Sequence, residues 1–185
     1  MSLRFSASIA LGLSLLLLSG CGEPTSAVAS GHAANVASGS FDVGRPAEYR
    51  RPGVYRGFAD SHGVYLVSGH QMLVALAAEC TNPEHRSAEV RWDEVAGVFR
   101  CATCDAKYTR DGLNRGTSRA RLALQRCRIR QSGQIYDPAS TIIVDPGSRF
   151  VQERQEWSKS TSYFPLTEVL QAQQTAERAA RSGGS

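Results

Sequence analysis

Soft metal ligands stand in two short motifs near the middle of the sequence. One apolar run ends in the motif Cys80-x-Asn82, and a second ends in Cys101-x-x-Cys104. Thiolates are ligands for zinc and for iron–sulfur clusters, and β-proteins can bring them together on loops that follow strands. The two motifs therefore predict a metal or cluster site that is assembled from two loops.

Short apolar runs separated by turn residues surround both motifs. They predict strands at residues 64–67, 72–77, 90–92, 97–100 and 122–130. No helical period is visible between residues 41 and 135. These features predict an all-β domain over residues 41–135, built as a small antiparallel sandwich or barrel.

The segment 136–185 is predicted to be a C-terminal extension of this domain. Residues 142–144 are expected to form a strand that is closed by a turn at 145–148. Phe150 and Trp157 are able to pack back on the domain from a charged, amphipathic stretch. A helix is predicted over 165–181, because a proline in the first turn and an acidic residue near the positive end favour helix initiation.

The N-terminal residues 1–20 have the layout of a secretory signal. Arg4 precedes an apolar run that is too short for a stable transmembrane helix. The run ends in Leu18-Ser-Gly-Cys21, which resembles the lipobox of a bacterial lipoprotein and implies that Cys21 is lipidated. An ordinary signal peptide with an incidental cysteine is the alternative. Residues 21–40 are predicted to be a flexible tether to a membrane of the bacterial cell envelope, outside the cytoplasm.

The composition excludes some functions. The formal net charge is +4, with 42% hydrophobic and 21% charged residues, which is ordinary for a globular protein. This positive excess is too small for a dedicated nucleic-acid binder. No Ser/His/Asp set, carboxylate pair or phosphate-binding loop is legible, so no catalytic machinery is predicted.

Several strings distributed over residues 41–131 resemble a Rieske iron–sulfur domain. These strings lie at 41–44, 64–67, 75–81, 99–101 and 111–116, followed by Leu122 and Leu124. A Rieske domain holds a 2Fe-2S cluster with a Cys-x-His and a Cys-x-x-His box. The resemblance therefore implies an antiparallel β fold, a 2Fe-2S cluster and single-electron exchange with a redox partner protein.

The ligand set departs from this family at both boxes. Asn82 and Cys104 stand where a Rieske domain has its two histidine ligands, and His85 and Thr103 stand where many members have disulfide cysteines. Tyr108 fits the aromatic residue expected after the second box. The resemblance thus implies an altered ligand set, namely Cys80, His85, Cys101 and Cys104.

Three interpretations of these ligands follow. Three thiolates and one imidazole suit tetrahedral zinc, and they also suit a 2Fe-2S cluster with a single histidine. A metal-free domain is the third, because exported cysteines tend to form disulfides and Cys127 makes the number of remaining cysteines even. Our first hypothesis is a membrane-tethered single-electron carrier. The competing hypothesis is a cluster-free structural or interaction module, stabilised by disulfides or zinc, that keeps the Rieske fold.

Two further predictions concern residues outside the ligand set. Arg126, Arg128 and Arg130 alternate with apolar residues, so they share one face of a strand that is predicted to be solvated. Trp92 is predicted to lie in the core.

Overall fold

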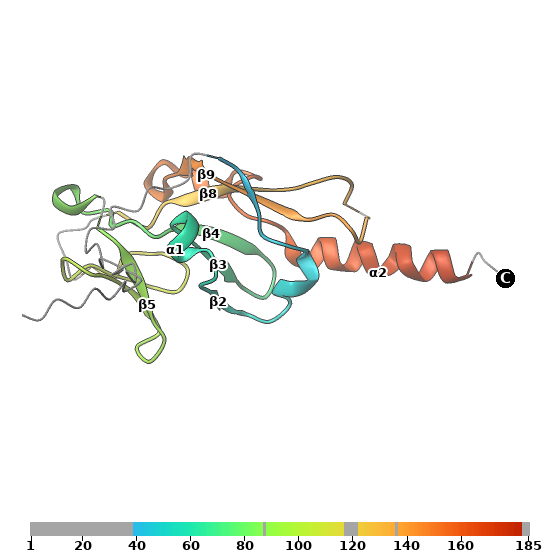
Figure 1. Ribbon diagram of the computed structural model, residues 1–185, viewed down its shortest axis with the longest axis horizontal. Coiled ribbons are helices and arrows are strands. Elements are labelled where there is room, and N and C mark those ends of the chain that lie inside the picture. Colours follow the sequence, from blue (N-terminus) through green and yellow to red (C-terminus); the bar gives the residue numbers. More distant parts are fainter. Residues whose placement is uncertain (1–38, 87, 117–121, 136, 183–185) are drawn as a thin grey trace, which may run out of the picture. The chain divides into compact units, whose positions relative to one another are not determined.

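The computed structural model describes residues 39–86, 88–116, 122–135 and 137–182 (Figure 1). These residues form two antiparallel sheets, a 6-stranded sheet in the order β1-β9-β8-β4-β3-β2 and a 3-stranded sheet in the order β5-β6-β7. The strands are β1 (Phe41–Asp42), β2 (Gly53–Tyr55), β3 (Val64–Ser68), β4 (Leu73–Ala77), β5 (Val90–Asp93), β6 (Val98–Cys101), β7 (Lys107–Tyr108), β8 (Arg126–Gln131) and β9 (Ile142–Phe150). The prediction of an all-β fold with a C-terminal helix is confirmed.

The helices are few and mostly short. They are α1 (Ala59–His62), α2 (Leu166–Ser182) and the 3₁₀ helices η1 (Pro46–Tyr49), η2 (Pro83–His85), η3 (Gln152–Arg154) and η4 (Glu156–Ser158). Helices α1, η1 and η2 lie between residues 41 and 135, where the sequence shows no helical period. Each is about one turn long, and one turn leaves no periodic pattern in a sequence.

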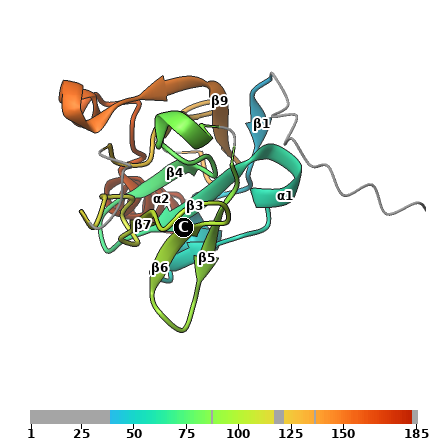
Figure 2. The same cartoon turned by 90° about the vertical axis from the view of Figure 1, so that its left-hand side faces the viewer.

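Strands β3 and β4 form the centre of the larger sheet and are buried over their whole length. Side chains alternate between the two faces of a strand, so each strand supplies two cores. Leu66 and Ala75 belong to one core, into which α2 also packs. Tyr65 and Leu76 belong to a second core, which also contains Phe99 from the smaller sheet. Figure 2 shows β5, β6 and β7 of that smaller sheet.

The predicted turn at residues 145–148 lies inside strand β9. Asp145 pairs with Arg128 of β8 and Arg149 pairs with Cys127, so the register shifts and the residues between them bulge out of the ladder. The Asp145 carboxylate accepts hydrogen bonds from the Gly147 N–H at 2.9 Å and from the Ser148 hydroxyl at 2.6 Å. The Asp-Pro-Gly sequence thus makes a β-bulge, where a proline is tolerated because its missing N–H breaks no ladder bond. Through β9, the segment 136–185 pairs with both β1 and β8.

Arg126 corrects the prediction of a solvated arginine face on β8. Arg128 and Arg130 are exposed, whereas Arg126 is only 8% exposed. Its guanidinium carbon lies 4.0 Å from the centroid of the Trp157 ring. The chain after β9 folds back over this end of the strand, as predicted for Trp157, and therefore covers the first arginine but not the other two.

Helix α2 closes the first core with its N-terminal half. Leu166 and Val169 are buried, and the Gln173 amide donates to the Asp137 carbonyl at 3.1 Å. From residue 174 onward its side chains are exposed, except for the half-buried Ala176. Within the part of the chain that the structure describes, no helix has the length and apolar character needed to cross a membrane. The predicted signal sequence, Cys21 and residues 22–38 of the tether lie outside the described residues.

Candidate metal centre

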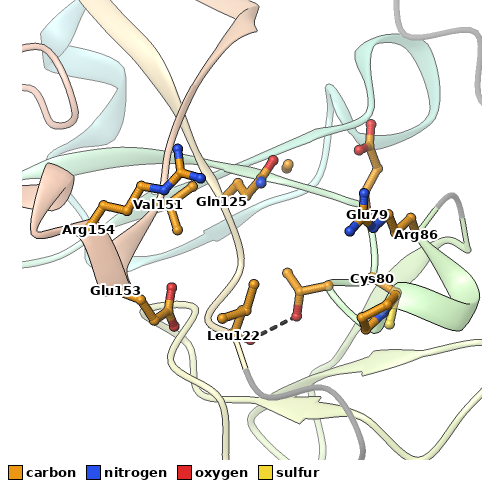
Figure 3. Close-up of a pocket in the computed structure, with 11 residues that line it drawn as sticks. Glu79, Cys80, Arg86, Leu122, Gln125, Val151, Glu153 and Arg154 are labelled. Atoms are coloured by element: carbon orange, nitrogen blue, oxygen red, sulfur yellow. Dashed lines mark hydrogen bonds between the residues drawn. The ribbon is translucent and has the colours of Figure 1, made fainter.

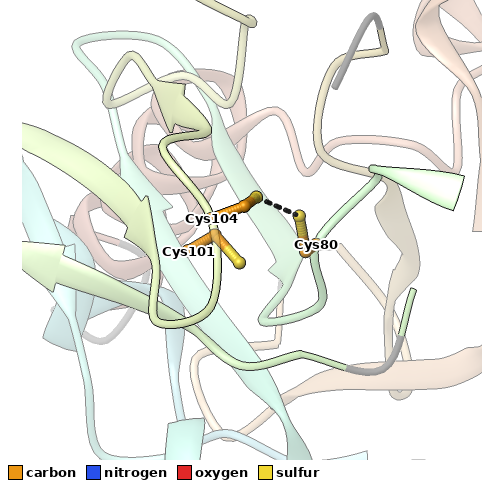
Figure 4. Close-up of side chains that lie close together, drawn as sticks. All are labelled: Cys80, Cys101 and Cys104. Carbon is orange, nitrogen blue, oxygen red and sulfur yellow. Dashed lines mark hydrogen bonds between the residues drawn. The ribbon is translucent and has the colours of Figure 1, made fainter. Parts of the chain in front are cut away.

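The fold brings three of the predicted ligands together. The Sγ atoms of Cys80, Cys101 and Cys104 all lie within 4.8 Å of one another (Figure 4). The Cys80 and Cys104 sulfurs are 3.7 Å apart. Cys80 and Cys101 are buried, whereas Cys104 is half-buried. The two motifs that are separated in sequence therefore form one thiol cluster, and this cluster could hold a metal ion.

Backbone pairing between the two sheets positions these cysteines. Cys80 follows β4 of the larger sheet, and its N–H donates to the Ala88 carbonyl at 2.9 Å. The Val90 N–H donates back to the Ala78 carbonyl at 2.9 Å. Cys101 ends β6, and its N–H donates to the Ala106 carbonyl at 3.0 Å, which closes the loop that carries Cys104. The thiol cluster thus lies where the two sheets join.

Both Cys loops direct a backbone N–H at a sulfur atom. The Asn82 N–H donates to the Cys80 Sγ at 3.5 Å, and the Thr103 N–H donates to the Cys101 Sγ at 3.4 Å. Each donor comes two residues after its cysteine, so the two loops repeat one local turn. Such hydrogen bonds stabilise negative charge on sulfur, as a thiolate ligand requires.

The metal-free thiols differ in acidity. Burial raises the pKa of Cys80 to about 11. At Cys104 burial also acts to raise the pKa, but hydrogen bonds from the Ala106 N–H, Cys101, Cys80 and the Asn82 side chain outweigh it, so the pKa lies below its ordinary value. The half-buried Cys104 is therefore the thiol that ionises more readily of these two.

Asn82 and His85, the residues at the altered positions of the first Cys motif, differ in their location relative to the thiol cluster. Asn82 is 3% exposed, and its Oδ1 accepts a hydrogen bond from the Glu84 N–H at 3.1 Å, which caps helix η2. His85 is the last residue of η2 and is half-buried, and its ring nitrogens are not part of the group of clustered ligand atoms. The structure thus assembles Cys80, Cys101 and Cys104 but leaves the predicted fourth ligand, His85, outside the cluster.

Cys127 lies apart from these three thiols. It is fully buried in the first core, and its Sγ accepts from the Arg149 Nη1 at 3.5 Å. The four cysteines that the structure describes are all free thiols. Burial raises the pKa of Cys127 to about 12, so it stays protonated at neutral pH.

A cavity of about 600 Å³ adjoins the thiol cluster (Figure 3). Cys80 lines it together with residues that follow β4, precede β8 and form η3. These segments are distant in sequence and carry no shared motif. Sequence reasoning therefore could not find this cavity, because only the strand pairing of the larger sheet brings its walls together.

No protein-family model matches this sequence, and no curated protein matches it.

Proposed function

We propose that this chain is a Rieske-like metal–thiolate protein in which Cys80, Cys101 and Cys104 bind one zinc ion. The close mutual spacing of the three sulfurs carries the proposal. Tetrahedral zinc with Zn–S bonds of about 2.3 Å places its sulfur ligands roughly 3.8 Å apart. The Cys80–Cys104 separation of 3.7 Å fits that edge without rearrangement.

A 2Fe-2S cluster divides its four ligands between two irons. Ligands on different irons lie farther apart than ligands on one ion. By the pattern of the family boxes, Cys104 would bind a different iron from Cys80 and Cys101. The compact arrangement of all three thiols therefore favours a single ion.

The ion would join the two sheets, whatever occupies its fourth coordination position. Cys80 follows β4 in the larger sheet, whereas Cys101 and Cys104 belong to the β6–β7 hairpin of the smaller one. An ion bound to all three cross-links the sheets at their junction. Three protein ligands leave a fourth tetrahedral position for water or an exogenous ligand, beside the half-buried Cys104.

A second candidate function is single-electron transfer through an altered 2Fe-2S site, with a redox partner protein. The hydrogen bonds directed at sulfur favour it, because such bonds tune the potential of iron–sulfur clusters. The Tyr108 hydroxyl adds to these donors, at 3.6 Å from the Cys80 Sγ. Under either function, the lipobox resemblance at Leu18–Cys21 supports a lipoprotein tethered to a membrane of the cell envelope.

Metal analysis and an absorption spectrum of the full chain, purified without oxygen, test the proposal. One zinc per chain, no visible bands and a coloured thiolate complex after cobalt replacement are expected. Cys80→Ser and Cys104→Ser should lose the metal, whereas the matched control Cys127→Ser should keep it, because Cys127 lies in the other core. About two irons per chain with visible bands would establish the electron carrier instead. A chain that binds neither metal would refute both functions.

A further inference from the structure

The cavity beside Cys80 has an uneven charge balance. Its two acidic residues already have partners within the protein. The Glu79 carboxylate pairs with the Arg149 guanidinium at 3.1 Å, and the Glu153 Oε1 accepts from the Ala123 N–H at 2.9 Å. The Glu79 charge is therefore neutralised by a cation, whereas Glu153 keeps its negative charge, so the two arginines that line the cavity exceed the remaining acidic charge by one.

The basic residues of the cavity have no such partners among the residues that the structure describes. Arg86 and Arg154 are exposed, and neither side chain forms an ion pair or hydrogen bond with any residue in the described ranges. The positive charge of Arg154 acts on the Glu156 carboxylate. That carboxylate is already bonded to Lys159 at 3.1 Å and to the Val151 N–H at 2.8 Å. Both guanidinium groups thus retain their donors for a ligand.

The cavity also has a neutral hydrogen-bond donor beside these two arginines. Gln125 is half-buried in the cavity wall, and its amide makes no hydrogen bond to any residue that the structure describes. In Figure 3, Arg154 and Arg86 stand on opposite sides of the cavity with Gln125 between them. Val151 and Leu122 add apolar surface to the same walls.

From this arrangement we infer that the cavity binds a small organic anion that carries a carboxylate or phosphate group. Guanidinium groups form strong, paired hydrogen bonds with both oxyanions, and the amide of Gln125 adds a further donor. The volume of about 600 Å³ suits a small molecule, since such sites span roughly 300–1,000 Å³. The apolar walls would contact the carbon skeleton of the ligand. This site does not depend on metal at the thiol cluster.

Isothermal titration calorimetry of the full chain with succinate and with inorganic phosphate tests this inference, and the two probes distinguish a carboxylate from a phosphate ligand. The titrations are made at about 0.15 M salt, where long-range attraction to surface charge is screened. Saturable binding of at least one probe is expected. Arg86→Gln and Arg154→Gln should each weaken it about tenfold or more, because each removes charge-assisted hydrogen bonds.

Arg178→Gln is the matched control, because Arg178 is an exposed arginine on α2 that does not line the cavity. This variant should bind the probe as the wild type does. Circular dichroism and metal content of each variant check that the fold and thiol cluster are intact. The inference is refuted if neither probe binds saturably, or if binding survives both cavity substitutions unchanged. Neither result would alter the metal content, so the site and the metal proposal fail separately.

Discussion

Tyr108 couples the first Cys loop to the smaller sheet, and phenylalanine at this position removes its hydroxyl while keeping its ring. Its ring is fully buried in the second core. Its hydroxyl accepts from the Thr81 N–H at 3.2 Å and lies 3.0 Å from the Thr81 Oγ1. Burial raises the pKa of this hydroxyl well above its usual range, so it stays protonated and can donate across ordinary pH.

The expected cost of Tyr108→Phe follows from these contacts. Phenylalanine retains the ring and opens no large cavity, so the loss is confined to the hydroxyl. Its contact with the Cys80 Sγ at 3.6 Å is also lost, but sulfur is a weak hydrogen-bond partner and this adds little. The Thr81 N–H is left without its acceptor, which costs about 1–3 kcal/mol for a partly buried donor. The Thr81 hydroxyl keeps its bond to the Leu122 carbonyl at 2.8 Å, so it adds little. We expect a loss of about 2 kcal/mol, which corresponds to a Tm lower by roughly 4–8 °C.

Urea unfolding of the metal-free full chain, followed by circular dichroism, measures this loss. Tyr163→Phe is the matched control, because Tyr163 packs beside the same core and its hydroxyl has no hydrogen-bond partner among the described residues. It should change stability by less than about 0.5 kcal/mol. The reasoning fails if Tyr108→Phe is equally mild, or if both substitutions destabilise to the same extent.

Four further predictions concern other parts of the fold. Asn82→Ala should lower the free energy of unfolding by about 1–2 kcal/mol, because it removes both the cap on η2 and the side-chain hydrogen bond to Cys104. Metal analysis should show unchanged metal content, because the three thiol ligands are retained. Cys127 has its pKa raised from 9.0 to about 12, so the folded state holds its proton more tightly and the stability it contributes falls as pH rises from 9 towards 12. Urea midpoints between about pH 8 and 10.5 should therefore fall less steeply in Cys127→Ala than in the wild type; equal slopes would contradict this assignment. Trp157→Ala should cost about 2–4 kcal/mol in urea unfolding by uncovering the face of β8. Arg126→Met should cost less than about 1 kcal/mol, because it keeps the stem and removes a buried guanidinium whose Nε has no partner; a larger loss than in Trp157→Ala would contradict that view.

Local chemistry in the sequence indicated the central strands, the C-terminal helix and the meeting of the two Cys motifs. The apolar runs identified β3 and β4 as strands, and the structure buries both over their whole length. The helix predicted over 165–181 is α2, displaced by one residue at each end, because a proline start and a glycine-rich stop are local signals. The two Cys motifs follow strands, so their meeting could be inferred before any pairing was known.

Other features depended on long-range contacts that no local pattern encodes. Arg126 is buried and Arg128 is exposed although they share one strand face, because only the first is covered by the returning chain and Trp157. His85 is close to Cys80 in sequence, but η2 leaves it outside the cluster. The cavity beside Cys80 has walls from three segments that the sheet pairing brings together. Periodicity and turn chemistry act over a few residues, whereas the neighbours of a side chain are decided by strand order and by the path of the chain after β9.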